Sequence, residues 1–281
     1  MKKLLILFIS LFATPFALLA QPAFTSDIAP IVEERDNLFT LGVLSYLYHR
    51  LETEPKPGWH IAALIAWDVE DINRTPDFVI ERNQNFEKQG NIFHAEIMAI
   101  EKASQKNKSL SVSSSLTREE INKRLGMTTT TLYTSLEPCP LCKMGATWSR
   151  IPKVVYFMDD PGIRNIETYA PVSLPQKFCG RMLIQVNPSS LPLALKINQE
   201  LRDLFSQESP EGYVITLPSG EKILNFAKYF EEHLEELLRC GHELFCSYEI
   251  LYDQNKDLYA KLVNATELCP DDKSYSSSKT P

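Results

Sequence analysis

Residues 132–160 read LYTSLEPCPLCKMGATWSRIPKVVYFMDD, and this stretch decides the fold of the chain. The segment 128–136 is rich in β-branched residues and predicts a strand. The segment 139–150 predicts a helix, and KVVYFM at 153–158 predicts a second strand. A strand, a helix and a strand in succession are typical of an α/β domain.

The segments on either side extend this alternation of helices and strands. Apolar patterning predicts, in chain order, a helix at 34–51, a hairpin of two strands at 60–67 and 77–81, a helix at 94–104, a fifth strand at 181–186 and a helix at 191–205. Residues 105–117, rich in Lys and Ser, predict a surface insertion. We therefore expect the α/β class, with a three-layer α/β/α fold around a mixed five-stranded sheet.

Shifts in composition mark the boundaries of the domain. Thr117 begins a capping box that predicts a short helix, and SQESPEG at 206–212 predicts a linker. An apolar stripe beyond the linker predicts helices over 221–262. We divide the chain into a signal peptide at 1–20, an α/β domain at 34–206, a mainly helical C-terminal extension at 207–269 and a disordered tail at 270–281.

The first 20 residues have the pattern of a secretory signal peptide. Lys2 and Lys3 precede an almost unbroken apolar run, Leu4 to Leu19, which ends at the small residue Ala20. An uncleaved N-terminal anchor is the alternative. Because no later run approaches the roughly 20 apolar residues of a membrane helix, we expect the mature protein to be periplasmic or secreted, with no membrane association after cleavage.

The composition excludes several classes of protein. The 281 residues include 44% hydrophobic and 23% charged side chains, which excludes a disordered, collagen-like or polytopic membrane protein. The formal charge is −7, and the loss of two lysines with the leader makes it −9. Because nucleic-acid-binding proteins usually carry a basic excess, this charge argues against a nucleic-acid partner.

Two short motifs together predict a zinc site. His94-Ala95-Glu96 and Pro138-Cys139-Pro140-Leu141-Cys142 each stand at the beginning of a predicted helix. One imidazole and two thiolates suit catalytic zinc, which keeps its fourth position for water. Cys139 and Cys142 are three residues apart, so a helix places them on one face. A helix N-terminus also favours the thiolate over the thiol.

The spacing of His94 and Glu96 assigns them different roles. Two residues apart in a helix, their side chains would point about 200° apart. Both can face one metal ion only if His94 caps the helix and Glu96 lies in its first turn. Glu96 is then placed to move a proton between the activated water and a substrate. A redox pair is the alternative interpretation of C-x-x-C in an exported protein, but it leaves the HAE motif unexplained.

In these motifs and in the segments 94–100 and 132–160, the chain resembles the zinc-dependent cytidine/deoxycytidylate deaminase superfamily, in which H-x-E and P-C-x-x-C form the signature of the metal site. The branch that it resembles contains tRNA adenosine deaminases, guanine deaminases and bacterial nucleoside deaminases. The resemblance extends over 36–205. It implies a cytidine-deaminase-like fold, Zn²⁺ held by His94, Cys139 and Cys142, and a catalytic, proton-shuttling Glu96.

The resemblance also implies residues that contact the substrate. Asn83 matches an asparagine that binds the base or sugar, and Asp160 lies where the branch often has an acid at the mouth of the pocket. Phe93 and Trp148 are candidates for stacking on a base. Each has a structural alternative: Asn83 as a turn residue, Asp160 as a loop acid, and the two aromatic residues as core.

Three features of the chain depart from the family pattern. The loop QNFEKQGNIF at 84–93 lacks the Asp-Pro-Thr pattern that is common before HAE, which leaves the substrate open. The insertion at 105–126 and the extension lie outside the family core. Four further cysteines remain, with their pairing undetermined: Cys179, Cys240, Cys246 and Cys269.

We therefore expect an exported hydrolase that acts on C–N bonds of cyclic amidines. It would deaminate a small nucleobase or nucleoside, on the purine side by resemblance, and release ammonia. One alternative is a secreted interaction or effector protein that uses the deaminase fold. Another is a nucleic-acid deaminase that acts on tRNA adenosine. A homodimer is a further expectation.

Overall fold

The computed structural model describes most of the chain between residues 28 and 266. The described residues are 28–53, 60–113, 117, 127–160, 177–178, 181–182, 185–205, 212, 214–216, 218–220 and 222–266. The predicted signal peptide, the short helix after Thr117, residues 206–211 of the linker and the predicted tail lie outside them. Within these ranges, no helix combines the length and apolar composition that crossing a membrane requires.

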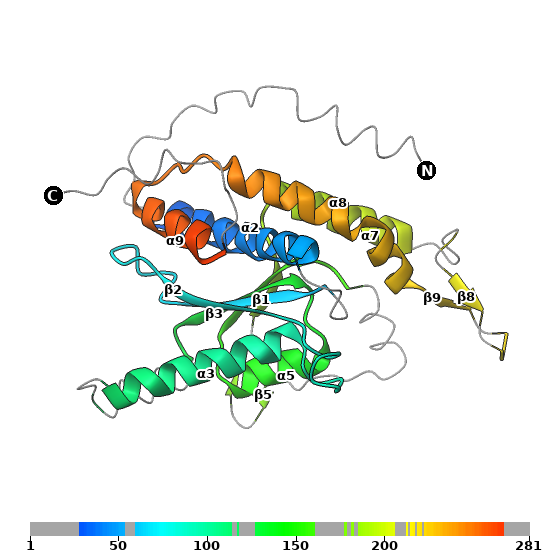
Figure 1. Cartoon of the computed structure of the whole chain (residues 1–281), viewed down its shortest axis with the longest axis horizontal. Helices are drawn as coiled ribbons and strands as arrows, with labels where there is room; N and C mark the ends of the chain where they lie inside the picture. The colour runs from blue at the N-terminus through cyan, green and yellow to red at the C-terminus, as the bar shows by residue number, and fades with distance from the viewer. Residues whose placement is uncertain are drawn as a thin grey trace.

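A five-stranded mixed sheet forms the centre of the molecule (Figure 1). The strand order is β2-β1-β3-β4-β7, with bounds β1 Ala62–Trp67, β2 Asp77–Arg82, β3 Thr130–Leu136, β4 Lys153–Met158 and β7 Gln185–Pro188. The predicted hairpin is present, because β1 pairs antiparallel with β2, in a register that joins Ala62 to Arg82. β1 also pairs antiparallel with β3, whereas β3–β4 and β4–β7 are parallel. The expected α/β class and mixed sheet are therefore confirmed.

The predicted position of the fifth strand is wrong. The sequence placed that strand at 181–186, but the strand that joins the sheet is β7, which begins at Gln185. Arg181–Met182 forms β6 and pairs instead with β5, Lys177–Phe178, in a separate two-stranded sheet. A third small sheet pairs β8, Val214–Thr216, with β9, Lys222–Leu224, so the helix expected from residue 221 begins instead at Phe226.

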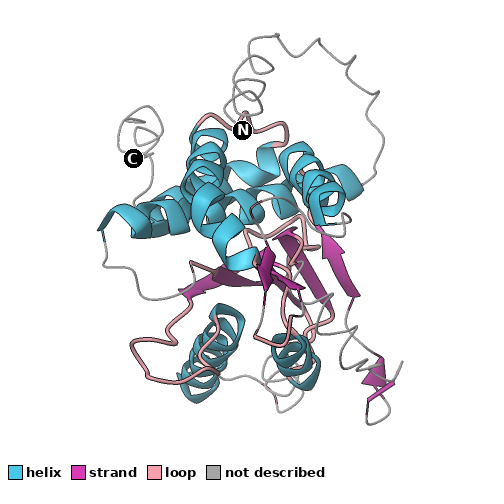
Figure 2. Cartoon of the chain, turned by 90° about the vertical axis from the view of Figure 1, so that its right-hand side faces the viewer, coloured by secondary structure: helices cyan, strands magenta, loops and turns pink. Residues whose placement is uncertain are grey.

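Helices cover both faces of the sheet (Figure 2). On one face lie α3, Ala95–Ser113, and α5, Pro140–Trp148; on the other lie α2, Ala29–Thr53, and α7, Pro192–Phe205. Successive strand residues contribute to the two cores in alternation, as a pleated strand requires. Leu64, Tyr133 and Val155 join the core under α2, whereas Ile65 and Leu132 join the core under α3 and α5.

The C-terminal extension forms a further layer over α2. It consists of α8, Phe226–Cys246, the short 3₁₀ helix η1, Asp253–Asn255, and α9, Lys256–Thr266. α8 approaches α2 so closely that a Cβ atom at Gly241 would lie 2.7 Å from Leu44 Cδ1. Because α2 lies between the sheet and these helices, every residue from 38 to 47 is buried, and the helix is apolar on all sides rather than along one stripe.

α3 is longer than the sequence predicted. It continues nine residues past Ser104 into the expected surface insertion. Lys106, in this continuation, pairs with Asp77 of β2 at 2.5 Å. An ion pair across to β2 therefore holds the first turn of the continuation on the sheet.

A buried arginine joins both ends of the described chain to the β1–β2 turn. The side chain of Arg35 is fully buried and donates to the backbone carbonyls of Val69, Asp71, Ile72 and Arg74 at 2.8–3.4 Å. Its Nε donates to Asn255 Oδ1 at 2.8 Å. The turn after β1 is therefore fixed from beneath by a guanidinium whose donors are matched by protein acceptors.

Candidate metal centre

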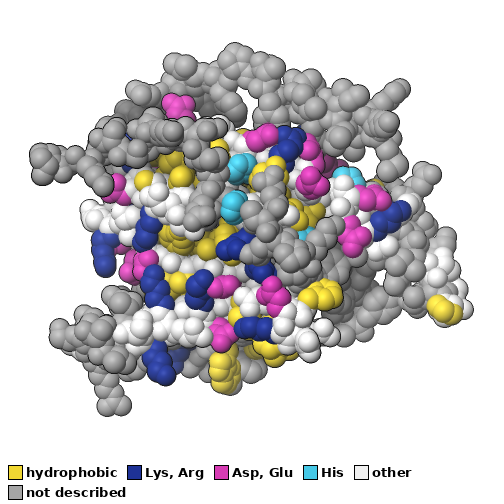
Figure 3. Space-filling model, in the orientation of Figure 1, with side chains coloured by type: hydrophobic (Ala, Val, Ile, Leu, Met, Phe, Trp, Pro, Cys, Tyr) yellow, Lys and Arg dark blue, Asp and Glu magenta, His cyan; other side chains and the backbone are white. Residues whose placement is uncertain are grey.

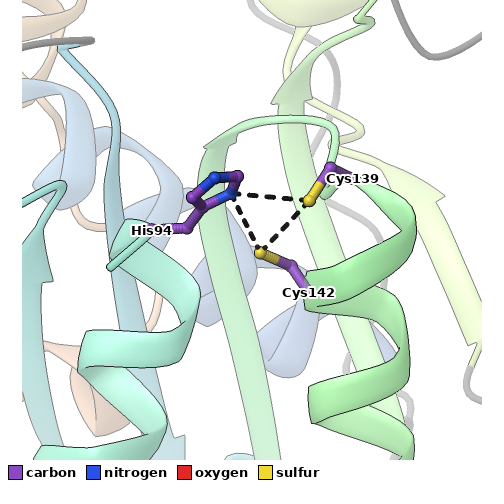
Figure 4. A group of neighbouring side chains, drawn as sticks. All are labelled: His94, Cys139 and Cys142. Carbon is purple, nitrogen blue, oxygen red and sulfur yellow. Dashed lines mark hydrogen bonds between the residues drawn. The ribbon is translucent and has the colours of Figure 1, made fainter. Parts of the chain in front are cut away.

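Two helix N-termini meet at the carboxyl end of β3 (Figure 4). His94 precedes the first residue of α3, and its carbonyl accepts the Met98 N–H at 3.0 Å, which makes it the N-cap. Cys139 is the N-cap of α5, with extended backbone and Pro140 in the first turn. The expectation that His94 caps its helix is therefore confirmed.

The three side chains form a nearly equilateral triangle of donor atoms. His94 Nδ1 lies 3.4 Å from Cys139 Sγ and 3.5 Å from Cys142 Sγ, and the two sulfur atoms are 3.5 Å apart. Tetrahedral zinc, with Zn–S near 2.3 Å and Zn–N near 2.0–2.1 Å, requires about 3.8 Å between two thiolates and about 3.6 Å from a thiolate to an imidazole nitrogen. The observed separations are within about 0.3 Å of these values, so the donor set fits zinc.

The electrostatics of the triangle favour anionic sulfur. The sulfur atoms of Cys139 and Cys142 share a hydrogen bond at 3.5 Å, and this bond lowers the pKa of Cys139 to about 4. The same bond, together with burial, raises the pKa of Cys142. The bond between His94 and Cys139 raises the pKa of His94. Because metal ligands must be deprotonated, a divalent cation would displace the protons shared among these three groups.

Glu96 lies in the first turn of α3, where the sequence placed it. Its side chain is 3% exposed, and burial raises the pKa of its carboxyl group to about 7. The carboxyl group also forms a hydrogen bond with Cys142, and this contact places it next to the donor triangle. Glu96 is thus placed to exchange protons at the metal centre, although it is not one of the three side chains that form the donor triangle.

Asn83 is held in a turn directly after β2. It is buried, and its Oδ1 accepts the Asn85 N–H at 2.9 Å. The next residue, Gln84, donates its N–H to the Phe93 carbonyl at 2.9 Å, so this backbone runs beside the residue that precedes His94. Asn83 therefore has the turn role that was its structural alternative, and its amide Nδ2 is the group left for a ligand.

Two further candidates for substrate contact, Phe93 and Asp160, are in contact with neighbouring parts of the chain. Phe93 packs against Gly90, and Lys88 Nζ lies 5.2 Å from its ring centre. Asp160 follows β4 at the same edge of the sheet as Cys139, and its N–H donates to Glu137 Oε2 at 3.4 Å.

Trp148 is not brought to the metal centre. It lies at the far end of α5 from Cys139 and is 65% exposed. There it lines a shallow apolar groove between α3 and α5 with Ile97, Ile100 and Leu141. The structural alternative for Trp148, a core residue, is wrong, because the residue is 65% exposed.

Glu137 is a positioning residue that no sequence motif identified. Its carboxylate accepts from Lys143 Nζ at 2.9 Å and from the N–H of Asp160, and both side chains of the ion pair are largely buried. Its N–H donates to the Met158 carbonyl at 2.8 Å. Glu137 thus ties the segment before Cys139 to α5 and to the end of β4. Its place immediately before Pro138 and Cys139 was the only sequence signal.

Replacing one thiol tests the metal centre. We expect Cys142→Ser to lose most bound zinc and to lower the melting temperature, because the metal joins the N-termini of α3 and α5. Cys240→Ser is the matched control, since Cys240 is a free, half-buried thiol on α8, and it should keep full zinc. Elemental analysis of both variants decides the matter, and a Cys142→Ser protein with one zinc per chain would contradict the assignment.

Comparison with known proteins agrees with this geometry. Residues 49–158 match the cytidine and deoxycytidylate deaminase zinc-binding region, a range that includes His94, Cys139 and Cys142. No match to the chain was found among curated proteins.

Solved structures similar to the chain include several deaminases. A tRNA:A34 deaminase is 18% identical, with 55% of this chain and 98% of that chain covered and a TM-score of 0.34. A guanine deaminase from Nitrosomonas europaea is 15% identical (68% and 100% covered, TM-score 0.36), and one from Bacillus subtilis is 20% identical (61% and 96%, TM-score 0.32). All three TM-scores are below 0.5, so these structures carry no argument. What the comparisons show is that residues 49–158 match the zinc-binding region of cytidine and deoxycytidylate deaminases and contain the three donor residues.

Proposed function

We propose that this chain is an exported zinc-dependent hydrolase that removes the amino group from a free nucleobase or nucleoside and releases ammonia. The observation that carries the proposal is the buried Glu96 carboxyl group beside a triangle of one imidazole and two thiols, within the deaminase zinc-binding region.

The residues at the centre supply the parts that such a hydrolysis needs. His94, Cys139 and Cys142 would hold the zinc ion, which supplies a Lewis acid when bound. Glu96 would accept a proton from the attacking water and deliver it to the leaving amino group, because burial keeps its pKa within reach of neutral pH. Asn83 would present its amide Nδ2 to the substrate.

The surface supports a small substrate rather than RNA. Nucleic-acid binding draws most of its non-specific affinity from Lys and Arg contacts to phosphates. The chain instead has a formal charge of −7. On the face shown in Figure 3, the described basic and acidic side chains are interspersed. A base or nucleoside needs only a small pocket with a few polar contacts.

Glu96→Gln separates the proton shuttle from the metal ligands. We expect this variant to keep its zinc and its fold, and to lose turnover by about 10²–10⁴-fold, because an amide cannot exchange the proton. Glu101→Gln is the matched control, as an exposed acid on the same helix, and should retain turnover. Loss of zinc from Glu96→Gln, or turnover equal to that of the control, would refute the assigned role.

A substrate panel tests the substrate class. We expect ammonia release from one or more purine or pyrimidine bases or nucleosides at physiological salt, and slower release from stem-loop RNA. Faster turnover of the RNA, decreasing steeply as salt rises, would establish the nucleic-acid deaminase instead. Zinc-loaded protein that is inactive on the whole panel would favour the interaction or effector protein.

Export is the second part of the proposal. It is supported by the leader pattern of residues 1–20 and by Cys246, which is disulfide-bonded, since disulfides persist in oxidising compartments. We expect the full chain expressed in a bacterial host to reach the periplasm or medium with Gln21 as its first residue, as intact mass would show. A full-length protein retained in the cytoplasm would contradict export.

A further inference from the structure

A cavity lies at the opposite edge of the sheet from the metal centre. It has a volume of about 930 Å³, within the usual range for small-molecule sites. Its lining includes the turn after β1 (68–71), the start of β3 (128–131), the turn between α5 and β4 (150–153), Thr147 and Gln185. β3 begins here and ends just before Cys139, so its seven residues put about 20 Å between the two sites.

Two charged residues of the lining have no partner among the described residues. Asp68 lies 3.9 Å from Arg74, Asp71 accepts from the Asn73 N–H, and Lys153 pairs with Asp36 at 2.5 Å. Glu70 and Arg150 have no ion pair or side-chain hydrogen bond within the described part of the chain. They have opposite charges and lie on different turns, one after β1 and one before β4. The cavity therefore offers one unpaired acid and one unpaired base.

The backbone of Arg150 is in a conformation that favours glycine. The Arg150 N–H donates to the Thr147 carbonyl at 3.1 Å, and the Ile151 N–H donates to the Ala146 carbonyl at 3.0 Å. These two bonds form a Schellman motif, whose left-handed position is usually glycine. Arg150 occupies that position with φ of 63°. Glycine would adopt this conformation at lower cost, so the arginine places a long basic side chain at the cavity at some cost in backbone energy.

The acidic wall of the cavity is fixed in advance of any ligand. Asp68, at its edge, is also left-handed, with φ of 55°, and its N–H donates to the Thr129 carbonyl at 2.8 Å. The buried guanidinium of Arg35 binds four carbonyl groups of the same turn from beneath. A wall held in this way loses little conformational entropy when a ligand binds, which favours affinity.

The strand order separates the two charged walls at the level of the main chain. β1 and β4 are separated by β3, so the main chains of the two turns leave the sheet two strand spacings apart, about 10 Å. Threonines 128–131 also line the cavity. A short peptide such as triglycine carries an ammonium group at one end and a carboxylate group at the other, with amide groups between them.

We propose that this cavity is a binding site for a small zwitterion such as a short peptide, with its ammonium group at Glu70 and its carboxylate at Arg150. Arg150 would bind the carboxylate through a charge-assisted hydrogen bond, in the paired geometry that a guanidinium favours. The site is separate from the metal centre and does not depend on the substrate of the deaminase.

Triglycine and its two end-blocked forms test the proposal on the full chain. We expect triglycine to bind, as measured by NMR titration, and both N-acetyltriglycine and triglycine amide to bind at least about tenfold more weakly, since each lacks one charged end. Equal binding of N-acetyltriglycine or of inorganic phosphate would identify a simple anion site and overturn the proposal. So would the absence of binding at about 10 mM triglycine, well above a Kd of about 1 mM.

Variants locate the binding and distinguish it from a structural effect. We expect Arg150→Gly to raise the melting temperature by about 2 °C, because glycine suits the left-handed backbone, and to weaken triglycine by about tenfold or more. Gln89→Gly is the matched control: its φ is 51°, it lies outside the cavity lining, and it should leave triglycine binding unchanged. Triglycine bound equally tightly by Arg150→Gly would overturn the assignment.

Glu70→Gln tests the other end of the ligand. It should weaken triglycine by about tenfold but leave the residual affinity for N-acetyltriglycine unchanged, because the acetylated peptide has no ammonium group to lose. An equal loss for both peptides would show that Glu70 does not recognise the ammonium group.

Discussion

Three donor atoms from two helices must lie about 3.5 Å apart, and this constraint governs the arrangement of the domain. Both helices have to begin at the same edge of the sheet, so α3 and α5 follow strands whose carboxyl ends lie there. The crossover from β3 through α5 to the parallel strand β4 satisfies this requirement for the two cysteines. His94 can join them only from the N-cap of α3, and that placement leaves the first helical turn for Glu96.

The sequence predicted those parts of the fold that depend on local patterns. Strands β1 to β4 were found within two residues at each end, because buried strands show as short apolar runs between turn signals. The fifth strand was misplaced, because Arg181 and Val186 share an apolar run although only the latter joins β4. The length of α3 was also missed, since Lys106, in its continuation, is held by Asp77 of β2, which is distant in the sequence.

The chemistry of the site was more predictable than its surroundings. His94, Glu96, Cys139 and Cys142 follow from spacing alone, because zinc geometry and helix geometry restrict which positions can meet. The exposure of Trp148 could not be derived in this way, since an aromatic residue near the end of a helix fits either a core or a groove until the neighbouring helix is placed. The left-handed backbone of Arg150 could not be predicted from the sequence either. A helix that ends in this conformation usually has glycine there, and this position holds arginine instead.

The two edges of the sheet meet opposite electrostatic requirements. At the carboxyl edge, helix N-termini face the donor triangle and stabilise anionic sulfur, so this edge suits a cation. At the other edge α5 ends, and the C-terminus of a helix favours a positive side chain such as Arg150. Reversing the direction of α5 would disfavour both groups at once. The same helix therefore favours anionic sulfur at its first residues and the guanidinium of Arg150 just past its last turn.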